Sequence, residues 1–139
     1  MIVVDASVAF KWIKSRHETQ VGEAYKLLEL HLNKEQKIII PNLLLIEVAN
    51  ALTTKSRASA KAIKIDLKKL SSLNLQIESL GEQDILRASL LAKKYKTSVY
   101  DMLYAVVAKE HGALLYTADA NFVRKTSFKF AKHLSEVKV

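Results

Sequence analysis

The stretch SVYDMLYAVVAKEHGALLYTADANF, residues 98–122, does most to decide how this chain should fold. Its first part predicts an apolar helix, and Gly112 is the expected residue at the C-terminal cap of that helix. The run LLYT that follows predicts a short strand. Asp119 comes directly after this strand, where an acid is either a turn residue or part of a site that needs a carboxylate at a strand end.

The same alternation of helix and strand extends along the rest of the chain. Short strands are predicted in MIVVD, KIII and LQIESL, and FKFAKHL predicts a last short strand or helix. Helices are predicted between them, over 7–14, 18–34, 42–55, 58–73 and 81–96. Strands separated by helices predict an α/β fold, a mainly parallel sheet flanked by helices on both faces. In such sheets, ligands bind outside the carboxyl ends of the strands.

Three details of these elements can be compared with the structure. Pro41 is expected to end the second strand and to lie in the first turn of the next helix. The helix over 42–55 is apolar nearly all round, which predicts burial on all sides. The helix over 18–34 is expected to face the core with a stripe formed by Val21, Tyr25, Leu28 and Leu32.

Composition narrows the range of functions. The 139 residues are enough for a single domain, 1–139, with a sizeable core. There is no Cys, which excludes disulfides, zinc–thiolate sites and thiol nucleophiles. Lys and Arg number 22 against 14 acids, a net charge of +8, which favours a polyanionic partner such as nucleic acid; the alternative is that the charge only aids solubility.

No segment of the sequence predicts secretion or membrane insertion. The N-terminus, MIVVDASVAFKW, reaches an acid at position 5 and lacks the basic start of a signal peptide. The longest uncharged apolar run, IIIPNLLLI, is far shorter than a membrane span. We therefore expect a cytoplasmic protein with no membrane partner.

Four of the fourteen acids lie in apolar surroundings. Asp5 ends an apolar strand, Glu47 lies inside LLLIEVANAL, Asp101 lies near the start of an apolar helix, and Asp119 follows a strand. Asp101 could cap a helix, and Asp5 and Asp119 could be turn residues. Glu47 is the hardest to explain structurally, because burial of an unpaired carboxylate is unfavourable by several kcal/mol.

If the four acids converge at one sheet edge, they need a counter-charge. Two like charges about 4 Å apart repel by roughly 4 kcal/mol at an effective dielectric near 20. Such a cluster must be protonated or hold cations, and a set of oxygen ligands without Cys or His selects Mg²⁺ or Mn²⁺. A metal of this kind binds a phosphodiester and activates the water that attacks phosphorus.

The motifs VVDASV, PNLLLIEVANAL, SVYDMLYAVVAKEHGALLYTAD and TADANF resemble the successive motifs of PIN-domain proteins, especially the VapC toxins of toxin–antitoxin pairs. The resemblance spans residues 2 to about 125. It implies a three-layer α/β/α domain and an endoribonuclease that depends on Mg²⁺ or Mn²⁺. It maps the catalytic and metal-binding acids onto Asp5, Glu47, Asp101 and Asp119.

The resemblance also implies supporting residues and partners. Ser7 and Thr117 match hydroxyls that orient a metal-bound water or a ligand carboxylate, and Asn121 is either an assisting residue or a loop cap. Proteins of this type usually form homodimers and are inhibited by a VapB-type antitoxin. The segment KWIKSRHET is basic where such toxins often carry an acid or Pro, a departure that concerns contact with an antitoxin and leaves the nuclease site untouched.

Three basic residues follow Asp5 in the chain and are predicted to contact the RNA substrate: Lys11, Lys14 and Arg16. Two alternatives keep the same fold: a non-catalytic module that binds RNA or protein, and a PIN nuclease of RNA processing outside a toxin pair. A phosphoacceptor domain is disfavoured, because it needs paired acids after the first strand and a Lys after the last.

Overall fold

The computed structural model describes residues 1–139 and contains one five-stranded sheet with the strand order β3-β2-β1-β4-β5. Every neighbouring pair is parallel, with Val3 opposite Ile39 on one side and Leu115 on the other. The strands are β1 (Ile2–Val4), β2 (Ile38–Pro41), β3 (Gln76–Glu78), β4 (Leu114–Thr117) and β5 (Ala131–His133).

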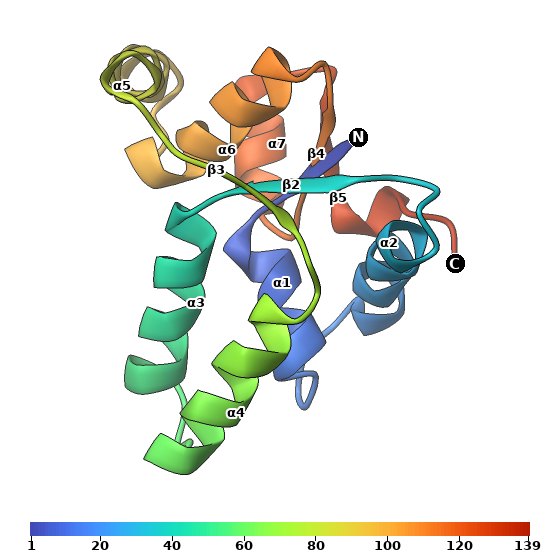
Figure 1. Ribbon diagram of the computed structural model, residues 1–139. Helices are drawn as coiled ribbons and strands as arrows, with labels where there is room; N and C mark the ends of the chain where they lie inside the picture. The colour runs from blue at the N-terminus through green and yellow to red at the C-terminus, as the bar shows by residue number, and fades with distance from the viewer.

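Helices cover both faces of this sheet, so the domain has the expected three α/β/α layers (Figure 1). The first four helices, α1 to α4, pack below the sheet in this view, and α5, α6 and α7 lie above it. The helices are α1 (Ala6–Ile13), α2 (Val21–Leu32), α3 (Leu43–Thr54), α4 (Ala60–Ser71), α5 (Glu82–Tyr95), α6 (Val99–Glu110) and α7 (Ala120–Thr126), followed by a 3₁₀ turn, η1 (Leu134–Glu136). No helix is both long enough and apolar enough to span a bilayer.

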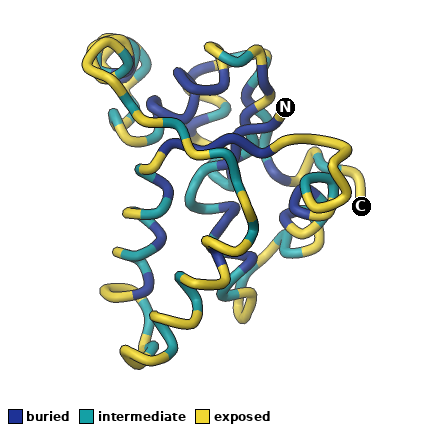
Figure 2. The backbone as a smooth tube through the Cα atoms, viewed as in Figure 1, coloured by how far each residue is buried: buried dark blue, intermediate teal, exposed yellow.

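The core lies on the two faces of β1 and β2 and under α6 (Figure 2). β1 and β2 are buried along their whole length, as expected for β-branched strands covered on both faces. Trp12 is 1% exposed, and its indole Nε1 donates to the carbonyl of Ala24, 2.8 Å away, which ties α1 to α2. The two edge strands, β3 and β5, have only three residues each, which limits pairing with other chains.

The opening stretch folds as its pattern predicts. α6 ends at Glu110, and Gly112 adopts a φ of +59°, the left-handed conformation that lets the chain reverse directly into β4. Seven consecutive residues of α6, Met102–Ala108, are buried, because this helix lies across β1, β2 and β4.

The three details of the elements named above agree only in part with the sequence expectation. Pro41 ends β2 as expected, but it is the last residue of the strand and not part of the next helix, and the Asn42 amide donates to the Glu78 carbonyl across the strands. α3 buries only one stripe, so the expected burial on all sides is wrong: Ile46 is 63% exposed. In α2 the buried stripe is Ala24, Leu27 and Leu28, whereas Tyr25 and Leu32 face outward.

The strand order fixes where a ligand can bind. The chain moves from β1 outward to β2 and β3, then crosses back to β4 and continues outward to β5. The loops that leave β1 and β4 therefore diverge to opposite faces of the sheet, and the carboxyl ends of these two neighbouring strands border a crevice. Asp5 and Asp119 follow these two strands.

Candidate active site

Asp5 is the most extensively held carboxylate of the site. It caps α1, and its Oδ1 accepts hydrogen bonds from Ser7 Oγ at 2.5 Å and from the Val8 amide at 3.3 Å. Its Oδ2 accepts a hydrogen bond from Thr117 Oγ1 at 2.5 Å. Burial raises the pKa of Asp5 to about 6, although these hydrogen bonds oppose the rise and the nearby charge of Asp101 adds to it.

Ser7 and Thr117 also bind the backbone of the loop that follows β4. Ser7 Oγ accepts from the Ala118 amide at 3.1 Å, and Thr117 Oγ1 accepts from the Asp119 amide at 3.0 Å. The same two hydroxyls donate to Asp5, which lies over a hundred positions away along the chain from Thr117. The network therefore fixes the β1–α1 and β4–α7 turns against each other.

Asp119 caps α7 with one oxygen and leaves the other without a hydrogen bond. Its Oδ1 accepts from the Phe122 amide at 3.1 Å, and Phe122 itself is buried beneath the turn. The structural role considered for Asp119 from the sequence is thus present, and Oδ2 remains available to a ligand.

Asp101 lies in the first turn of α6, but it is not the cap. Ser98 occupies the cap position, and its Oγ accepts from the Asp101 amide at 3.0 Å. Burial raises the pKa of Asp101, and the negative charge of Asp119 raises it further, against a hydrogen bond with Ser98. Asp5 follows β1, Asp119 follows β4, and Asp101 lies in the first turn of α6. The charge of Asp101 acts on Asp5, and that of Asp119 acts on Asp101, as expected for neighbouring carboxylates.

Glu47 reaches the site from α3 and is held by one contact, with Tyr104 of α6. Tyr104 Oη donates to Glu47 Oε1 at 2.5 Å, and Tyr104 is 1% exposed. Burial raises the pKa of Tyr104, and the hydrogen bond to Glu47 raises it further, so the phenol stays neutral and acts as a donor. Glu47 Oε2 has no hydrogen-bond partner.

The four carboxylates converge without forming a closed ligand shell. No three His, Cys, Asp or Glu side chains lie close enough together to hold a metal ion as they stand. The donor chemistry nevertheless suits a hard divalent cation, because all four groups offer oxygen. Burial raises the pKa of two of them, and a neighbouring carboxylate raises each further: Asp101 acts on Asp5, and Asp119 acts on Asp101. Binding of an ion by three or more of them would therefore require side-chain rearrangement.

The other residues singled out from the sequence lie in several environments. Asn121 is exposed on α7, and its Oδ1 accepts from Arg124 rather than contacting Asp119. Lys11 is buried, and its Nζ pairs with Glu18 at 3.0 Å. Lys14 Nζ lies 2.9 Å from Asp66 Oδ2, an ion pair without hydrogen-bond alignment. Arg16 is exposed and makes no ion pair.

Two residues beside the acids were not assigned to the site from the sequence. Tyr104 lies three residues after Asp101, on the same helix face, and this spacing is the signal that links it to the site. His133 ends β5, and its Nε2 lies 3.2 Å from the carbonyl of Ala118, next to Asp119. No spacing in the sequence indicates His133, because it reaches the site only through the sheet.

The fold and this arrangement of acids define a class of protein. The family model described as "PIN domain" matches residues 2–127, and the chain belongs to the PIN domain family. No curated protein sequence matches the chain significantly.

Several solved structures share the fold. PAE2754 from Pyrobaculum aerophilum is 24% identical, with a TM-score of 0.68 over 96% of this chain and 90% of that one. VapC20 of Mycobacterium tuberculosis, a toxin that cleaves the sarcin–ricin loop, is 17% identical, with a TM-score of 0.69 over 89% of this chain and 94% of that one. VapBC2 from Rickettsia felis, bound to a DNA fragment from its promoter, is 21% identical, with a TM-score of 0.72 over 96% and 98%. At these identities the similarity shows the fold alone.

Proposed function

We propose that this PIN domain is an endoribonuclease that cleaves RNA phosphodiesters with Mg²⁺ or Mn²⁺ held by Asp5, Glu47, Asp101 and Asp119. The observation that carries the proposal is the convergence of carboxylates from β1, α3, α6 and the β4–α7 turn at the crevice where the strand order reverses. A stable fold does not need several carboxylates together in a half-buried place, because like charges repel there.

A divalent cation held by these carboxylates would supply a Lewis acid for the phosphodiester and would lower the pKa of the attacking water. The residues of the chain have distinct tasks around it. Ser7 and Thr117 hold both oxygens of Asp5, so the orientation of this carboxylate is fixed before substrate arrives. Tyr104 fixes one oxygen of Glu47 and leaves Oε2 available to a ligand.

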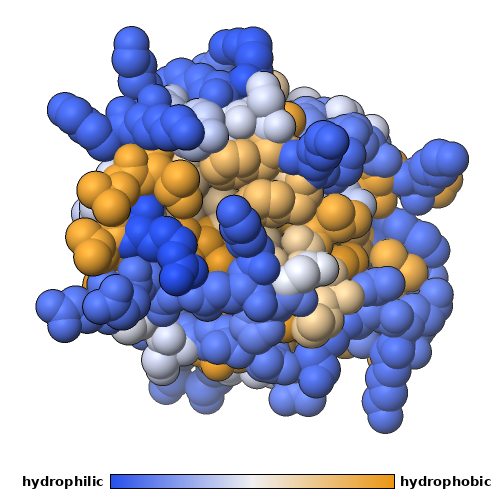
Figure 3. Space-filling model, turned by 90° about the horizontal axis from the view of Figure 1, so that it is seen from above, coloured by the Kyte–Doolittle hydropathy of each residue, from blue (hydrophilic) through white to orange (hydrophobic).

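We propose further that the nuclease is the toxin of a VapBC-type pair, with a VapB-type antitoxin and a homodimeric state. The similarity in fold to VapC20 and to VapBC2 supports this proposal. A dimer is also supported by exposed apolar side chains on α5, with Leu86 52% and Leu90 66% exposed. Figure 3 shows hydrophobic residues gathered on the face that contains α5, between hydrophilic side chains at its rim.

A second candidate is a non-catalytic module that binds RNA or protein through the same fold. The observation in its favour is the lack of three acidic side chains within ligating distance of one ion. The two candidates differ in their response to Mn²⁺, which a nuclease of this type binds and a simple module does not.

The test is cleavage of a structured RNA by the purified protein with Mn²⁺, compared with Asp5→Asn and Asp101→Asn. We expect the wild type to cleave and both variants to lose at least about 100-fold in rate. Mn²⁺ titration by calorimetry, with Lys37→Ala as an unrelated control, measures loss of metal binding, and circular dichroism of each variant measures loss of folding. Equal cleavage by all proteins would remove the assignment, and absence of both cleavage and Mn²⁺ binding would favour the non-catalytic module.

A further inference from the structure

We propose that a single RNA strand runs from the acids into a basic groove between the α1–α2 and α3–α4 loops, where Arg16, Lys55 and Arg57 bind its phosphates. The basic groove is defined by Phe10, Lys14, Arg16, His17, Lys55 and Arg57. This inference rests on the proposed function, because it assigns the path of the substrate at that site.

Two adjoining cavities form the path. The first, of about 530 Å³, is lined by Ser7 and Glu47 at the acids and reaches Lys55 at its far end. The second, of about 710 Å³, begins at Lys55 and continues to Arg16 and Arg57. Both cavities are lined by Phe10, Glu18 and Lys55, so they adjoin along these three residues.

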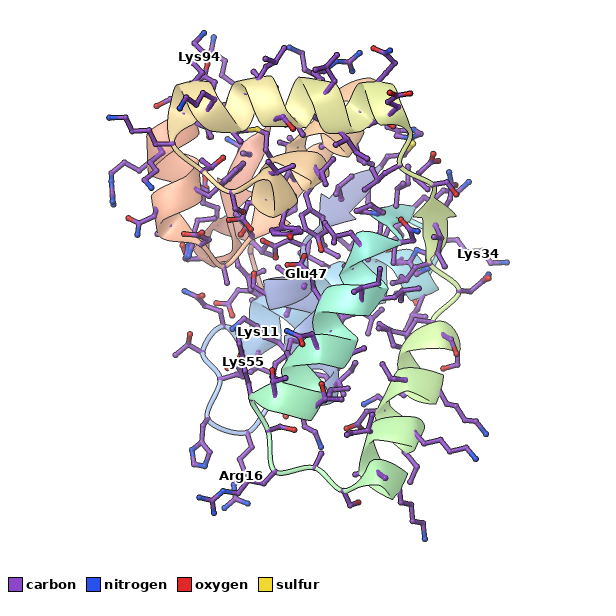
Figure 4. All side chains as sticks on the ribbon, turned by 90° about the vertical axis from the view of Figure 1, so that its left-hand side faces the viewer. Lys11, Arg16, Lys34, Glu47, Lys55 and Lys94 are labelled. Atoms are coloured by element: carbon purple, nitrogen blue, oxygen red, sulfur yellow. The ribbon has the colours of Figure 1, made fainter.

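The same line is visible in the side-chain view (Figure 4). Glu47, Lys11, Lys55 and Arg16 follow one another down the molecule, from the sheet edge to the two loops. α1 and α3 pack against each other along this line, so their C-terminal ends place both loops on the same side of the site.

Only some of the cations along this path are free for a ligand. Lys11 is neutralised by Glu18, and Lys14 by Asp66. Arg16, Lys55 and Arg57 are exposed and have no carboxylate within 4.0 Å. The far end of the path therefore has three uncompensated positive charges, which attract successive phosphates.

The wall of the groove favours a single strand. Phe10 lines both cavities and is only partly buried, so one part of its ring packs on the core and the rest faces the path. An aromatic side chain beside unpaired cations is the arrangement on which bases stack while phosphates are bound. An acidic protein segment would satisfy the charges, but it would not need an aromatic wall that continues to the acids.

The first test measures binding of a fluorescein-labelled 12-nucleotide single-stranded RNA in EDTA, where no cleavage occurs. We expect the variant Arg16→Ala/Lys55→Ala/Arg57→Ala to bind at least about 10-fold more weakly than the wild type. The slope of log K against log salt concentration should become shallower by about 2, because three phosphate contacts on a single strand are lost. The matched control, Lys37→Ala/Lys109→Ala/Lys138→Ala, removes the same charge at the opposite sheet edge and should bind like the wild type.

Phe10→Leu tests the stacking contact separately, since Leu keeps the apolar packing. We expect about 5-fold weaker binding or more with an unchanged salt dependence and an unchanged Tm. Equal RNA binding by the triple variant and its control would overturn the proposal. The proposal would also be overturned if the triple variant still bound RNA but lost affinity for a poly-glutamate peptide, because that result would indicate an acidic protein in the groove.

Cleavage assays distinguish failure of this inference from failure of the proposed function. With Mn²⁺, the triple variant should cleave the 12-mer more slowly than the wild type and a trinucleotide at the same rate, because the short substrate does not reach the groove. Equal rates on the 12-mer would contradict the groove but leave the nuclease intact. A wild type that cleaves nothing would contradict the nuclease, and the binding experiment in EDTA would still decide the groove.

Discussion

Asp5 and Asp119 come from strand ends, whereas Glu47 and Asp101 come from helices, and the two pairs are held differently. Asp5 accepts three hydrogen bonds, and Asp119 accepts one from the first turn of α7. Glu47 is held only by Tyr104. The strand-end acids form a fixed platform that also supports the fold, and the helix-borne acids are freer to adjust to a ligand.

The largest effect we expect separates the two roles of Asp119. Asp119→Asn keeps a side-chain oxygen for the Phe122 amide, so it should lose cleavage by at least about 100-fold with little change in stability. Asp119→Ala should lose the same activity and also about 1 kcal/mol of stability, because the cap is gone. Urea unfolding beside RNA cleavage measures both, and a stable Asp119→Ala protein would show that the cap does not support the fold.

The next effect concerns the hydroxyl that joins the two strand ends. Thr117→Val leaves the Asp119 amide and Asp5 Oδ2 without a partner, so we expect a loss of about 2 kcal/mol in urea unfolding. Thr117→Ser, which keeps the hydroxyl, is the matched control. If both variants were equally stable, the platform would depend on packing rather than on this network.

On the helix side, Tyr104→Phe removes one hydroxyl and keeps the ring. We expect about a 10-fold loss in cleavage rate or Mn²⁺ affinity, since a residue that only orients a ligand typically contributes 10–100-fold. Because Glu47 remains half-buried and solvated, stability should change by less than for Thr117→Val. If Tyr104→Phe lost more stability than Thr117→Val, the helix-borne acids would support the fold more than the strand-end acids do.

The pH dependence follows from the raised pKa of Asp5. The folded chain holds this proton up to about pH 6, whereas the unfolded chain releases it near 3.8, so the folded state binds more protons between these values. In metal-free buffer, stability should therefore fall as the pH rises from about 4 through 6, by on the order of 2 kcal/mol or less.

Asp5→Asn should flatten this dependence, which denaturant unfolding at several pH values measures. The slope difference between wild type and variant is the relevant quantity, because Asn also changes the hydrogen bonds with Ser7 and Thr117. Parallel curves for the two proteins would contradict the assignment of the proton to Asp5.

The smallest expected effect is the change in thermal stability caused by substituting Asp101, whose charge is disfavoured by burial and by Asp119. Without metal, Asp101→Asn should raise Tm by a few degrees, because it relieves repulsion. With Mn²⁺, the order should reverse, since the wild type gains stability from the ion and the variant does not. A lower Tm of the variant in metal-free buffer would indicate that Asp101 is paired structurally.

Much of the fold could be predicted from local pattern. The β-branched runs, the Gly112 turn and the alternation of helices with strands are properties of short windows, and the structure confirms the parallel sheet and its three layers. Errors arose where a helix carries apolar residues on more than one face. Ile46 and Leu32 are apolar but face outward, because other residues of their helices pack against the core. Periodicity does not choose among several apolar faces of one helix.

The sequence by itself determined which chemical groups are available to a ligand. It has no thiol ligands, an excess of positive charge, and four acids in apolar surroundings, and these are facts of composition and local context. Only the tertiary structure decided which groups meet. The sheet order brings Thr117 to Asp5, and a hydrogen bond joins Tyr104 of α6 to Glu47 of α3, although these helices lie on opposite faces of the sheet. Ion pairs neutralise Lys11 and Lys14 but leave Arg16, Lys55 and Arg57 free. Such contacts join residues far apart in the chain, so no local pattern encodes them.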